Sequence, residues 1–442
     1  MRLNKSLMTI AFLSLAGTSS ASETLGLKEA VTLALEKNHL IKAATSESAA
    51  ARAGLNSSRA RYLPRVTFKE EAVLTNSGTR AFMMKLDEGR FSLAGDLNHP
   101  ATTGDFQTSF GIEQPIVDLN LLRAGDVAGE ELAARGHALE KRRQEIAFRV
   151  YAAYLDVQRS KAQLSVAEQA VNDAREHRRI AGVRRESGVG LKFDELRIGT
   201  FLAELEQQQI TAENEVNLAR LRLGQIAGLP AGAAPDISEM ISAPGLTMMT
   251  ERLEKEALAN RADLKESTAE VARGDAGIAA VRGSYWPTLY ASGRYQMNDR
   301  DLPGGRDNDS WMVGATLRWE MFDTIIRKGD LEKAKALRDA GVSYQNALRQ
   351  EIGLQIRESL LRRTEAAKRL EVSRSAVHDA VEMVRLVNRR FESDLATAVE
   401  LLDAQTALNR ARGGLADNEA NFALATARVY HNAGLFLQEV VK

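Results

Sequence analysis

The chain has 442 residues, with 59 basic and 59 acidic side chains and no cysteine. The balanced charge leaves no positive surface of the kind that nucleic-acid binding requires. The absence of cysteine excludes disulfides, a thiol nucleophile, cysteine-based zinc sites and an amino-terminal lipid-modified cysteine. Aromatic residues make up only 5% of the chain, a fraction typical of long alanine-rich helices rather than of one large compact core.

Residues 1–21 have the pattern of a secretory signal peptide. Arg2 and Lys5 form a charged start, residues 7–16 an apolar core, and residues 19–21 a cleavage site of small side chains. An apolar core of about ten residues is too short to span a bilayer, which requires roughly 20. No later segment is long and apolar enough for a membrane helix, so we expect an exported chain that crosses a membrane, if at all, with strands.

The mature chain begins with a predicted helix over residues 25–62, which Pro64 ends. Two strands follow, at about 65–76 and 105–117. In the second strand, apolar side chains recur at even spacing on one face, as expected of a half-buried strand: Phe106, Phe110, Ile112 and Ile116. The insert between the two strands, residues 76–105, is predicted to be a polar surface loop.

The next proline-free tract, residues 116–229, predicts a very long helical hairpin. Its helix over 121–187 is followed by a turn near 188–194 and a return helix over 191–228. Large side chains at one heptad position alternate with small ones at the other, a pattern that favours close antiparallel packing: Val150, Val157, Leu164 and Val171 against Ala153, Ser160, Ala167 and Ala174. At 1.5 Å per residue, the long helix is roughly 100 Å in length.

A connector rich in proline and glycine, residues 229–250, leads to the second half of the chain. There the predicted elements recur in the same order. They are a helix over 251–285, strands at about 288–298 and 310–322, a long helix in the proline-free tract 304–442, a tip near 393–400, a return helix over 397–434 and a tail over 435–442.

The two halves also match in sequence. The stretch RYLP around Pro64 matches SYWP around Pro287 at an offset of 223, and Asp194 matches Glu400 at an offset of 206. We therefore expect two repeats, 22–228 and 251–434, related by pseudo-twofold symmetry. In each repeat, one return helix and one short helix stacked end to end equal the length of the long helix, which predicts that they lie beside it.

The strands can be membrane strands or the strands of ordinary soluble hairpins, because both alternate in this way. Their length suits a tilted membrane strand, and Trp311 and Trp319 bracket the apolar face of the last strand like interfacial girdles. Together with Trp286, they are the candidate membrane-interface residues. Four strands cannot close a barrel, which begins at about eight, and an open edge is not tolerated in lipid. Three copies would supply twelve strands.

At this point the ordered motifs resemble those of the TolC-like outer-membrane efflux protein family, over essentially all of the mature chain. The stretches that carry the resemblance are LKEAVTLALEKNHLIKAA, the RYLP and SYWP motifs, the strand exits QPIVDLNLLRAGD and WEMFDTIIRKGD, and the helical turns SGVGLKFDELRIG and SDLATAVELLDAQTALNRAR. The resemblance implies a mainly α fold with membrane β-strands. In it, duplicated antiparallel coiled-coil hairpins form a periplasmic tunnel, and four strands per chain contribute to a trimeric 12-stranded outer-membrane barrel.

The resemblance also implies roles for residues at the two helical tips. The residues matching the adaptor-docking tip are Gly188, Gly190, Leu191, Asp394 and Leu395, and those matching the acidic pore entrance are Asp194, Glu400 and Asp403. Some family members hold the entrance closed with a basic residue and a tyrosine, where this chain has Ala396 and Phe391. Four arginines near the tip, at positions 184, 185, 389 and 390, are candidates to replace them.

Alternatives remain open for the acid pair Glu400 and Asp403. A solvated helix face is the commonest explanation of two acids three residues apart. A catalytic dyad would need a His, Ser or Lys constellation, which does not accompany them. The six histidines show no metal-ligand spacing. We therefore expect no enzyme activity, cofactor or metal site.

The predicted function is that of a trimeric outer-membrane channel, the passive exit duct of a tripartite efflux or type I secretion system. The implied partners are two further copies of the chain, a periplasmic adaptor, an inner-membrane pump and outer-membrane lipid. The alternative is a periplasmic coiled-coil scaffold or adaptor protein without a membrane barrel.

Overall fold

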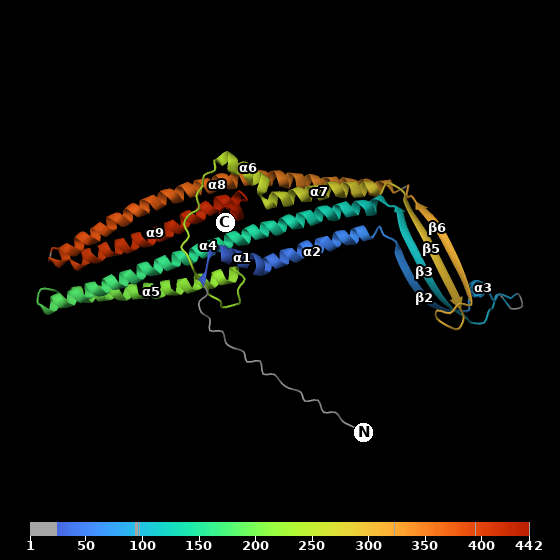
Figure 1. The fold of residues 1–442 in the computed structure, drawn as a ribbon, viewed down its shortest axis with the longest axis horizontal. Helices are drawn as coiled ribbons and strands as arrows, with labels where there is room; N and C mark the ends of the chain where they lie inside the picture. Colours follow the sequence, from blue (N-terminus) through green and yellow to red (C-terminus); the bar gives the residue numbers. More distant parts are fainter. Residues whose placement is uncertain (1–23, 93–95, 97, 322, 394, 442) are drawn as a thin grey trace, which may run out of the picture.

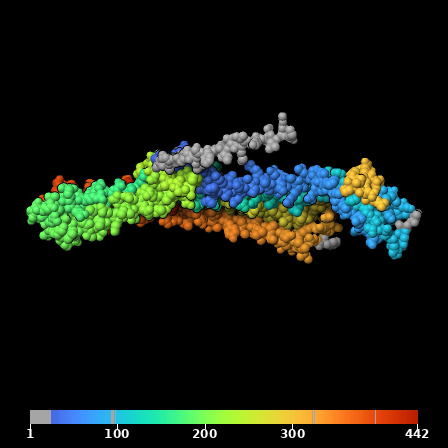
Figure 2. Space-filling model, turned by 90° about the horizontal axis from the view of Figure 1, so that it is seen from below, coloured from blue at the N-terminus to red at the C-terminus, as the bar shows by residue number. Residues whose placement is uncertain are grey.

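The computed structural model describes residues 24–92, 96, 98–321, 323–393 and 395–441. The predicted signal peptide and Asp394 lie outside these residues. The molecule is long and narrow, with a bundle of helices that leads at one end into a β-sheet (Figures 1 and 2).

Two very long helices run the length of the helical part. Helix α4 spans Leu119–Glu186 and α8 spans Thr324–Glu392, with 68 and 69 residues respectively. Each turns back into a helix of 35 residues, α5 (Lys192–Ile226) after α4 and α9 (Ala398–Asn432) after α8. At 1.5 Å per residue, each long helix is about 100 Å in length, as expected from the sequence.

The short helices differ from the prediction, because each is divided in two. Helices α1 (Leu27–Lys37) and α2 (His39–Ala60) are separated at Asn38, and α6 (Thr250–Asn260) and α7 (Ala262–Gly283) are separated at Arg261. The prediction of single helices over 25–62 and 251–285 is therefore wrong. Both break residues have extended backbone, with ψ angles of 127° and 123°, and the Asn38 side chain accepts a hydrogen bond from the Leu40 N–H.

Each break meets the end of a return helix. Gly228 follows α5 with φ +78°, and a Cβ there would lie 2.9 Å from the backbone N of Asn38. The Asn38 amide donates to the carbonyl of Ile226 at 2.9 Å. The second half repeats this contact, since Gly434 has φ +72° and Arg261 donates to the carbonyl of Asn432 at 3.4 Å. Left-handed backbone and close approach both require glycine here.

These contacts give the helical layer its arrangement. Helix α5 and the pair α1 and α2 lie end to end along α4, and α9 and the pair α6 and α7 lie end to end along α8 (Figure 1). The predicted layout of one long helix beside two stacked shorter ones is confirmed.

The sheet has four antiparallel strands in the order β2-β3-β5-β6. They span Arg65–Thr75 (β2), Thr103–Val117 (β3), Thr288–Asp299 (β5) and Asn308–Arg318 (β6). Strands β2 and β6 form its two edges. A second, much smaller sheet pairs β1 (Thr24–Leu25) in parallel with β4 (Asp236–Ile237) at the middle of the molecule.

The two faces of the large sheet differ in polarity. One row across all four strands consists of Phe68, Phe110, Tyr295 and Trp311, and the next row, on the other face, consists of Lys69, Ser109, Gln296 and Ser310. The first face continues with further apolar side chains in register: Val66, Ala72, Leu74, Ile112, Leu289, Ala291, Val313, Ala315 and Leu317. It lies open to solvent in the single chain, with Trp311 76% exposed.

The predicted alternation fails at one position of β3. A bulge lies between Pro115 and Val117, so that Val117 pairs with Leu289 and Ile116 drops out of the register. Proline has no N–H to donate to the ladder, which explains the irregularity at this point. Ile116 therefore has no register partner in β5, and Val117 stands opposite Leu289.

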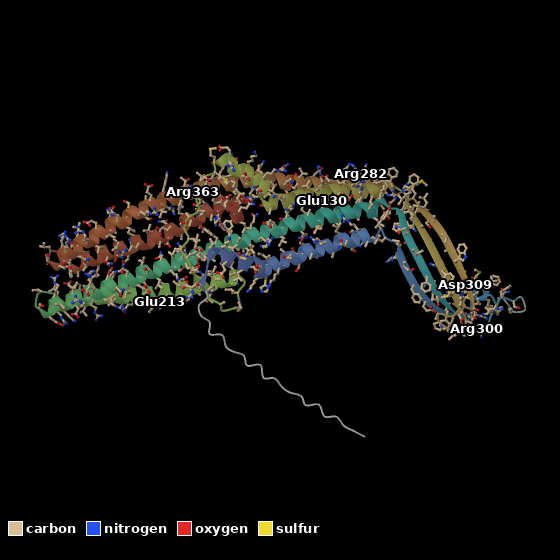
Figure 3. The ribbon with its side chains drawn as sticks, in the orientation of Figure 1. Glu130, Glu213, Arg282, Arg300, Asp309 and Arg363 are labelled. Carbon is tan, nitrogen blue, oxygen red and sulfur yellow. The ribbon has the colours of Figure 1, made fainter. Side chains whose placement is uncertain are left out.

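The insert between β2 and β3 contains a helix that the sequence analysis did not predict. Helix α3 spans Gly78–Asp87 and lies at the end of the sheet farthest from the other helices, the end where Arg300 and Asp309 also lie (Figures 1 and 3). Ala81 and Met84 are buried, and the Asn308 amide donates to the carbonyl of Asp87 at 2.8 Å.

The main apolar core lies at the middle of α4. Tyr151 and Tyr154 pack there with α1 and with α10 (Phe436–Glu439). The connector crosses the helices at this level (Figure 1), and Tyr154 donates to the carbonyl of Glu239 at 3.0 Å. Within the described part of the chain, none of the helices has an apolar stretch that would carry it through a bilayer.

Candidate functional site at the helical tips

The two helical turns lie together at the end of the molecule opposite the sheet (Figure 1). In the first turn, Gly188 has φ +77°, and a Cβ on Gly190 would lie 2.9 Å from the backbone N of Arg185. The N–H groups of Val189 and Gly190 both donate to the carbonyl of Arg184, at 3.1 and 3.0 Å. The chain therefore reverses tightly, and it leaves Leu191 67% exposed at the tip.

The second turn follows a different scheme. The N–H of Leu395 donates to the carbonyl of Arg390 at 2.7 Å, and the Arg390 guanidinium donates back to the carbonyl of Leu395 at 3.1 Å. Leu395 is 68% exposed, so each tip presents one exposed leucine beside its turn. Asp394, the fifth predicted docking residue, is outside the described residues.

Glu400 has a local structural role that the sequence analysis missed. It forms a capping box with Thr397, because the Thr397 side chain accepts from the Glu400 N–H and the Glu400 carboxylate accepts from the Thr397 N–H at 2.6 Å. These hydrogen bonds lower the pKa of Glu400. The Thr-x-x-Glu spacing is a known signal of such a helix start and was readable in the sequence.

The three predicted entrance acids are not brought together within one chain. Glu400 and Asp403 are exposed on the first turns of α9, and Asp403 lines a groove of about 920 Å³ between α4, α5 and α9. Asp194 is half-buried on the first turn of α5, the other return helix. Among the described residues, no three His, Asp or Glu side chains gather as metal ligands. The acids are therefore available as separate carboxylates at the tip end.

Arg184 joins the two hairpins at this end. Its guanidinium donates to the carbonyl of Phe391 and lies 4.9 Å from the centre of the Phe391 ring. Phe391 is buried in a cluster with Ala181, Ile198, Ala398, Leu401 and Leu402, against which Ala396 also packs. Of the four arginines singled out by sequence, Arg185 and Arg390 bond within their own hairpins. Arg184 is the one for which a contact between the hairpins is resolved.

Farther from the tip, a polar seam continues between α4 and α9. Gln405, which is 1% exposed, donates to Asp173 at 3.0 Å, and Gln163 donates to the carbonyl of Gly413 at 2.9 Å. His177 is buried in the same seam, where burial lowers its pKa despite the nearby Asp173 and a hydrogen bond with Gln405. The sequence did not single out these residues, because their role depends on which helices become neighbours.

The three tryptophans lie on or beside the sheet. Trp311 is in β6 near the end distant from the helices, whereas Trp286 and Trp319 lie just outside β5 and β6 at the helical end. All three are more than half exposed. Eight residues separate Trp311 from Trp319, about 26 Å along a strand, close to the roughly 25 Å height of the apolar band of membrane barrels.

Comparison with known proteins gives one family. The model described as outer membrane efflux protein matches residues 30–229 and 253–435. Curated relatives include the probable efflux pump outer membrane protein TtgC of Pseudomonas putida, 21% identical over 64% of this chain. That alignment spans only 59% of the relative's length. The outer membrane protein OprJ of Pseudomonas aeruginosa is 23% identical, over 86% of this chain and 78% of the relative.

The fold agrees with solved structures as well. The CmeC outer membrane channel of Campylobacter jejuni superimposes with a TM-score of 0.80 and 14% sequence identity, covering 100% of this chain and 95% of that one. At this identity, the match shows a common fold of the whole chain.

Proposed function

Because the chain belongs to the outer membrane efflux protein family, we propose that it is a trimeric outer-membrane channel and the passive exit duct of a tripartite efflux or type I secretion system. The family consists of outer-membrane channels of Gram-negative bacteria and is not an enzyme family. The helical part of the chain belongs to the periplasm. In the proposal, the sheets of three copies close a 12-stranded barrel, and their helices enclose a tunnel.

The observation that carries this proposal is the sheet. Its apolar face extends across all four strands. Among the described residues, no element covers this face, and the edge strands β2 and β6 have no partner. An edge in lipid leaves backbone groups unpaired, at a cost of several kcal/mol each. Because neighbouring strands alternate in direction, β6 of one copy can pair antiparallel with β2 of the next. Closure therefore satisfies every edge.

The outer edge of α8 supports the same arrangement. Apolar side chains that lie exposed along it include Leu354, Leu361 and Val372, spaced by seven and eleven residues. Such spacing keeps side chains on one stripe of a helix. The stripe matches a contact with a neighbouring copy. A periplasmic scaffold, the alternative function, would instead expose both the stripe and the apolar face of the sheet to water.

The tips are the proposed entrance and docking site. Leu191 and Leu395 project beside the turns, and with Gly188, Gly190 and Asp394 they form the proposed surface for the periplasmic adaptor, which connects the duct to an inner-membrane pump. Asp194, Glu400 and Asp403 of three copies would supply nine carboxylates around the entrance, and such rings favour cations. Trp286, Trp311 and Trp319 would anchor the barrel at the lipid interfaces. We also retain residues 22–228 and 251–434 as the two repeats.

Fractionation of cells that express the full chain tests the proposal. We expect the protein in the outer-membrane fraction, as a band of about three times the monomer mass that resists detergent and falls to the monomer on boiling. A soluble periplasmic monomer would contradict the proposal and would favour a scaffold or adaptor.

A further inference from the structure

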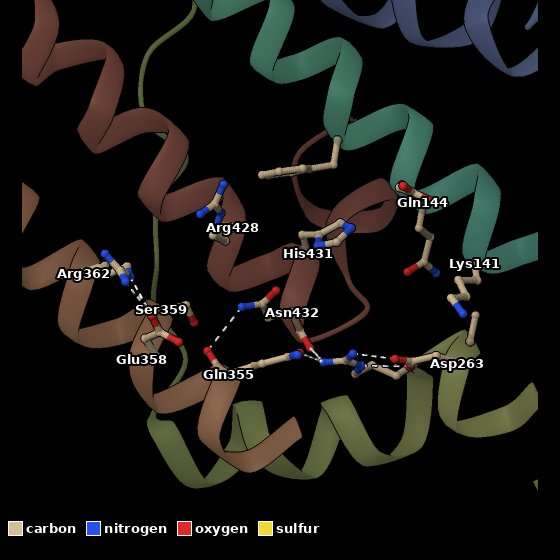
Figure 4. Close-up of a pocket in the computed structure, with 14 residues that line it drawn as sticks. Lys141, Gln144, Asp263, Gln355, Glu358, Ser359, Arg362, Arg428, His431 and Asn432 are labelled. Carbon is tan, nitrogen blue, oxygen red and sulfur yellow. Dashed lines mark hydrogen bonds and ion pairs between the residues drawn. The ribbon is translucent and has the colours of Figure 1, made fainter. Parts of the chain in front are cut away.

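A pocket at the middle of the molecule is not used by the proposed duct mechanism. It has a volume of about 530 Å³ and lies between α4, α7, α8 and α9 (Figure 4). A second hollow of about 360 Å³ between α8 and α9 shares Ser359, Arg362 and Arg428 with it. The two hollows therefore adjoin each other.

Three of the four cationic side chains in the pocket have acidic partners. Arg261 pairs with Asp263 at 2.5 Å, Arg362 with Glu358 at 2.7 Å, and Lys141 with Glu266 at 3.3 Å. The fourth is Arg428, which has no acidic partner among the described residues. In Figure 4, no dashed line reaches its guanidinium group.

The other half of the chain supplies an internal comparison. At the repeat offset of 206, Arg428 corresponds to Arg222, which pairs with Asp156 of the long helix α4 at 3.6 Å. The residue of α8 that corresponds to Asp156 is Arg362. The acid that neutralises the first arginine is thus replaced by a second arginine in this pocket. A like charge nearby disfavours a free cation and favours a bound anion.

An aromatic wall lies next to Arg428. The guanidinium carbon is 5.8 Å from the centre of the Phe148 ring, and the His431 ring is centred 4.5 Å from the same ring. Burial, together with the charges of Arg261 and Arg428, lowers the pKa of His431. The neutral form of the imidazole is therefore favoured at pH 7. It serves as a flat, weakly polar surface and does not repel or attract an ion.

The pocket opens on the side of α9 that faces away from the connector. Tyr430 donates to the carbonyl of Gly245 in the connector, and Arg428 lies two residues earlier, on the opposite side of a helix with 3.6 residues per turn.

We propose that this pocket binds a small organic anion, with its carboxylate on Arg428 and its flat apolar body against Phe148 and His431. A guanidinium presents donors in a fork that matches both oxygens of a carboxylate. The polar side chains of Gln355 and Ser359 line the same space. The ligand class is thus an aromatic or short apolar carboxylate.

Benzoate binding to the purified full-length chain, measured by calorimetry, tests this site. We expect Arg428→Gln to weaken benzoate binding by at least about tenfold, because a hydrogen-bonded charge partner is lost. Arg428→Lys keeps the charge but not the fork, and should give an intermediate loss. Arg222→Gln is the matched control in the other repeat and should bind benzoate like the unmodified chain. Benzamide, which is neutral, should bind at least about tenfold more weakly than benzoate.

Three outcomes would overturn the site: no benzoate binding to the unmodified chain, equal binding of benzoate and benzamide, or an equal loss in the Arg428 and Arg222 variants. Arg428, Phe148 and His431, which carry the proposed site, belong to one chain, so benzoate binding can be scored whether or not the protein proves to be a trimer. Failure of the anion site is therefore distinguishable from failure of the proposed channel.

Discussion

Arg184 joins the ends of the two hairpins by a polar contact, with the carbonyl of Phe391, and it also lies against the Phe391 ring. A hydrogen bond from a charged donor stabilises by about 1.5–3 kcal/mol, so its loss should shift a closed entrance toward open by roughly ten- to a hundredfold. We expect Arg184→Ala to raise single-channel conductance in planar bilayers and to leave the trimer intact.

Arg185 provides the matched control for this prediction. It is adjacent in sequence, but it pairs with Glu186 and Glu195 of its own hairpin. Arg185→Ala should therefore leave conductance near that of the unmodified channel. If both variants conduct alike, Arg184 does not hold the entrance closed.

The second prediction at the scale of residues concerns the effect of the entrance acids on ion selectivity. Glu400→Gln combined with Asp403→Asn should lower the cation-to-anion permeability ratio of the channel, because it removes six carboxylates from a trimer. Glutamine can retain the capping box at Thr397, so the helix start should persist. Glu371→Gln, on the exposed surface of α8, is the control. An unchanged ratio in the double variant would remove these acids from the mechanism.

His177 should make the stability of the fold depend on pH. Its pKa is lowered by burial, so the folded seam favours the neutral ring, and acidification favours states in which the ring is exposed. Stability from this site is fully present above the ordinary histidine pKa of about 6.5. It should be lost progressively as the pH falls below that value, and the loss should level off below the lowered pKa.

The measurement is the thermal midpoint between pH 7.5 and 5.5. The unmodified chain should lose more stability on acidification than His177→Gln, which keeps a polar side chain that does not titrate. Other histidines, including His431, contribute equally to both proteins, so the difference isolates His177. If the thermal midpoints of the two proteins change with pH in the same way, protonation of His177 does not affect stability.

At the scale of elements, the contacts between the stacked helices determine the length of each half. We call these contacts, Gly228 against Asn38 and Gly434 against Arg261, the joints. Gly228 and Gly434 have positive φ and lie against the backbone of the opposing break. An alanine at either position would be strained by about 1–3 kcal/mol and would also displace the neighbouring helix. We expect Gly228→Ala and Gly434→Ala each to lower the thermal midpoint measured by circular dichroism.

Gly136 offers the opposite case within the same protein. It lies inside α4, and a Cβ there would meet nothing within 4 Å. Because alanine is the better helix former, Gly136→Ala should stabilise by about 0.5–1 kcal/mol. A similar loss in all three variants would show that the joints carry no special constraint.

The sequence predicted the elements whose patterns are long. The heptads of the long helices and the alternation of the strands place most side chains on the correct face, because packing follows the period of the element. The break at Asn38 was also readable, since asparagine is a preferred helix cap. The break at Arg261 was not, because its side chain makes no cap and the chain there is set by contact with Gly434.

Short elements and contacts between distant segments could not be read in this way. The α3 helix has no side-chain cap at Ser77 and is held by a hydrogen bond from Asn308, more than 200 residues away. The contact of Arg184 with Phe391 likewise joins segments 207 residues apart. Sequence placed both residues near the tip, but only the fold shows that they meet.

At the scale of the whole molecule, the single chain exposes apolar surfaces and strand edges that a partner or lipid would cover. Among the described residues, no element covers the apolar face of the sheet or the exposed side chains Leu354, Leu361 and Val372 of α8, and the edge strands β2 and β6 have no partner. In water the apolar surfaces are unfavourable, and in lipid the unpaired strand edges are unfavourable. In the proposed trimer, neighbouring copies would pair the strand edges and contact α8, and lipid would cover the apolar face of the sheet. The alternating strand directions allow this closure without a parallel junction.

The most direct test of this account is a disulfide between edge strands in a chain that has no cysteine of its own. Lys69→Cys in β2 is combined in turn with Ser310→Cys, Met312→Cys or Gly314→Cys in β6. The control pair, Ser109→Cys with Gln296→Cys, joins register partners of β3 and β5 within one chain.

After oxidation of membranes, at least one edge pair should give covalent dimers and trimers on denaturing gels, whereas the control should remain a monomer. If the control pair oxidises fully and all edge pairs remain monomers, β2 and β6 do not meet between copies. The proposed trimeric barrel would then be contradicted.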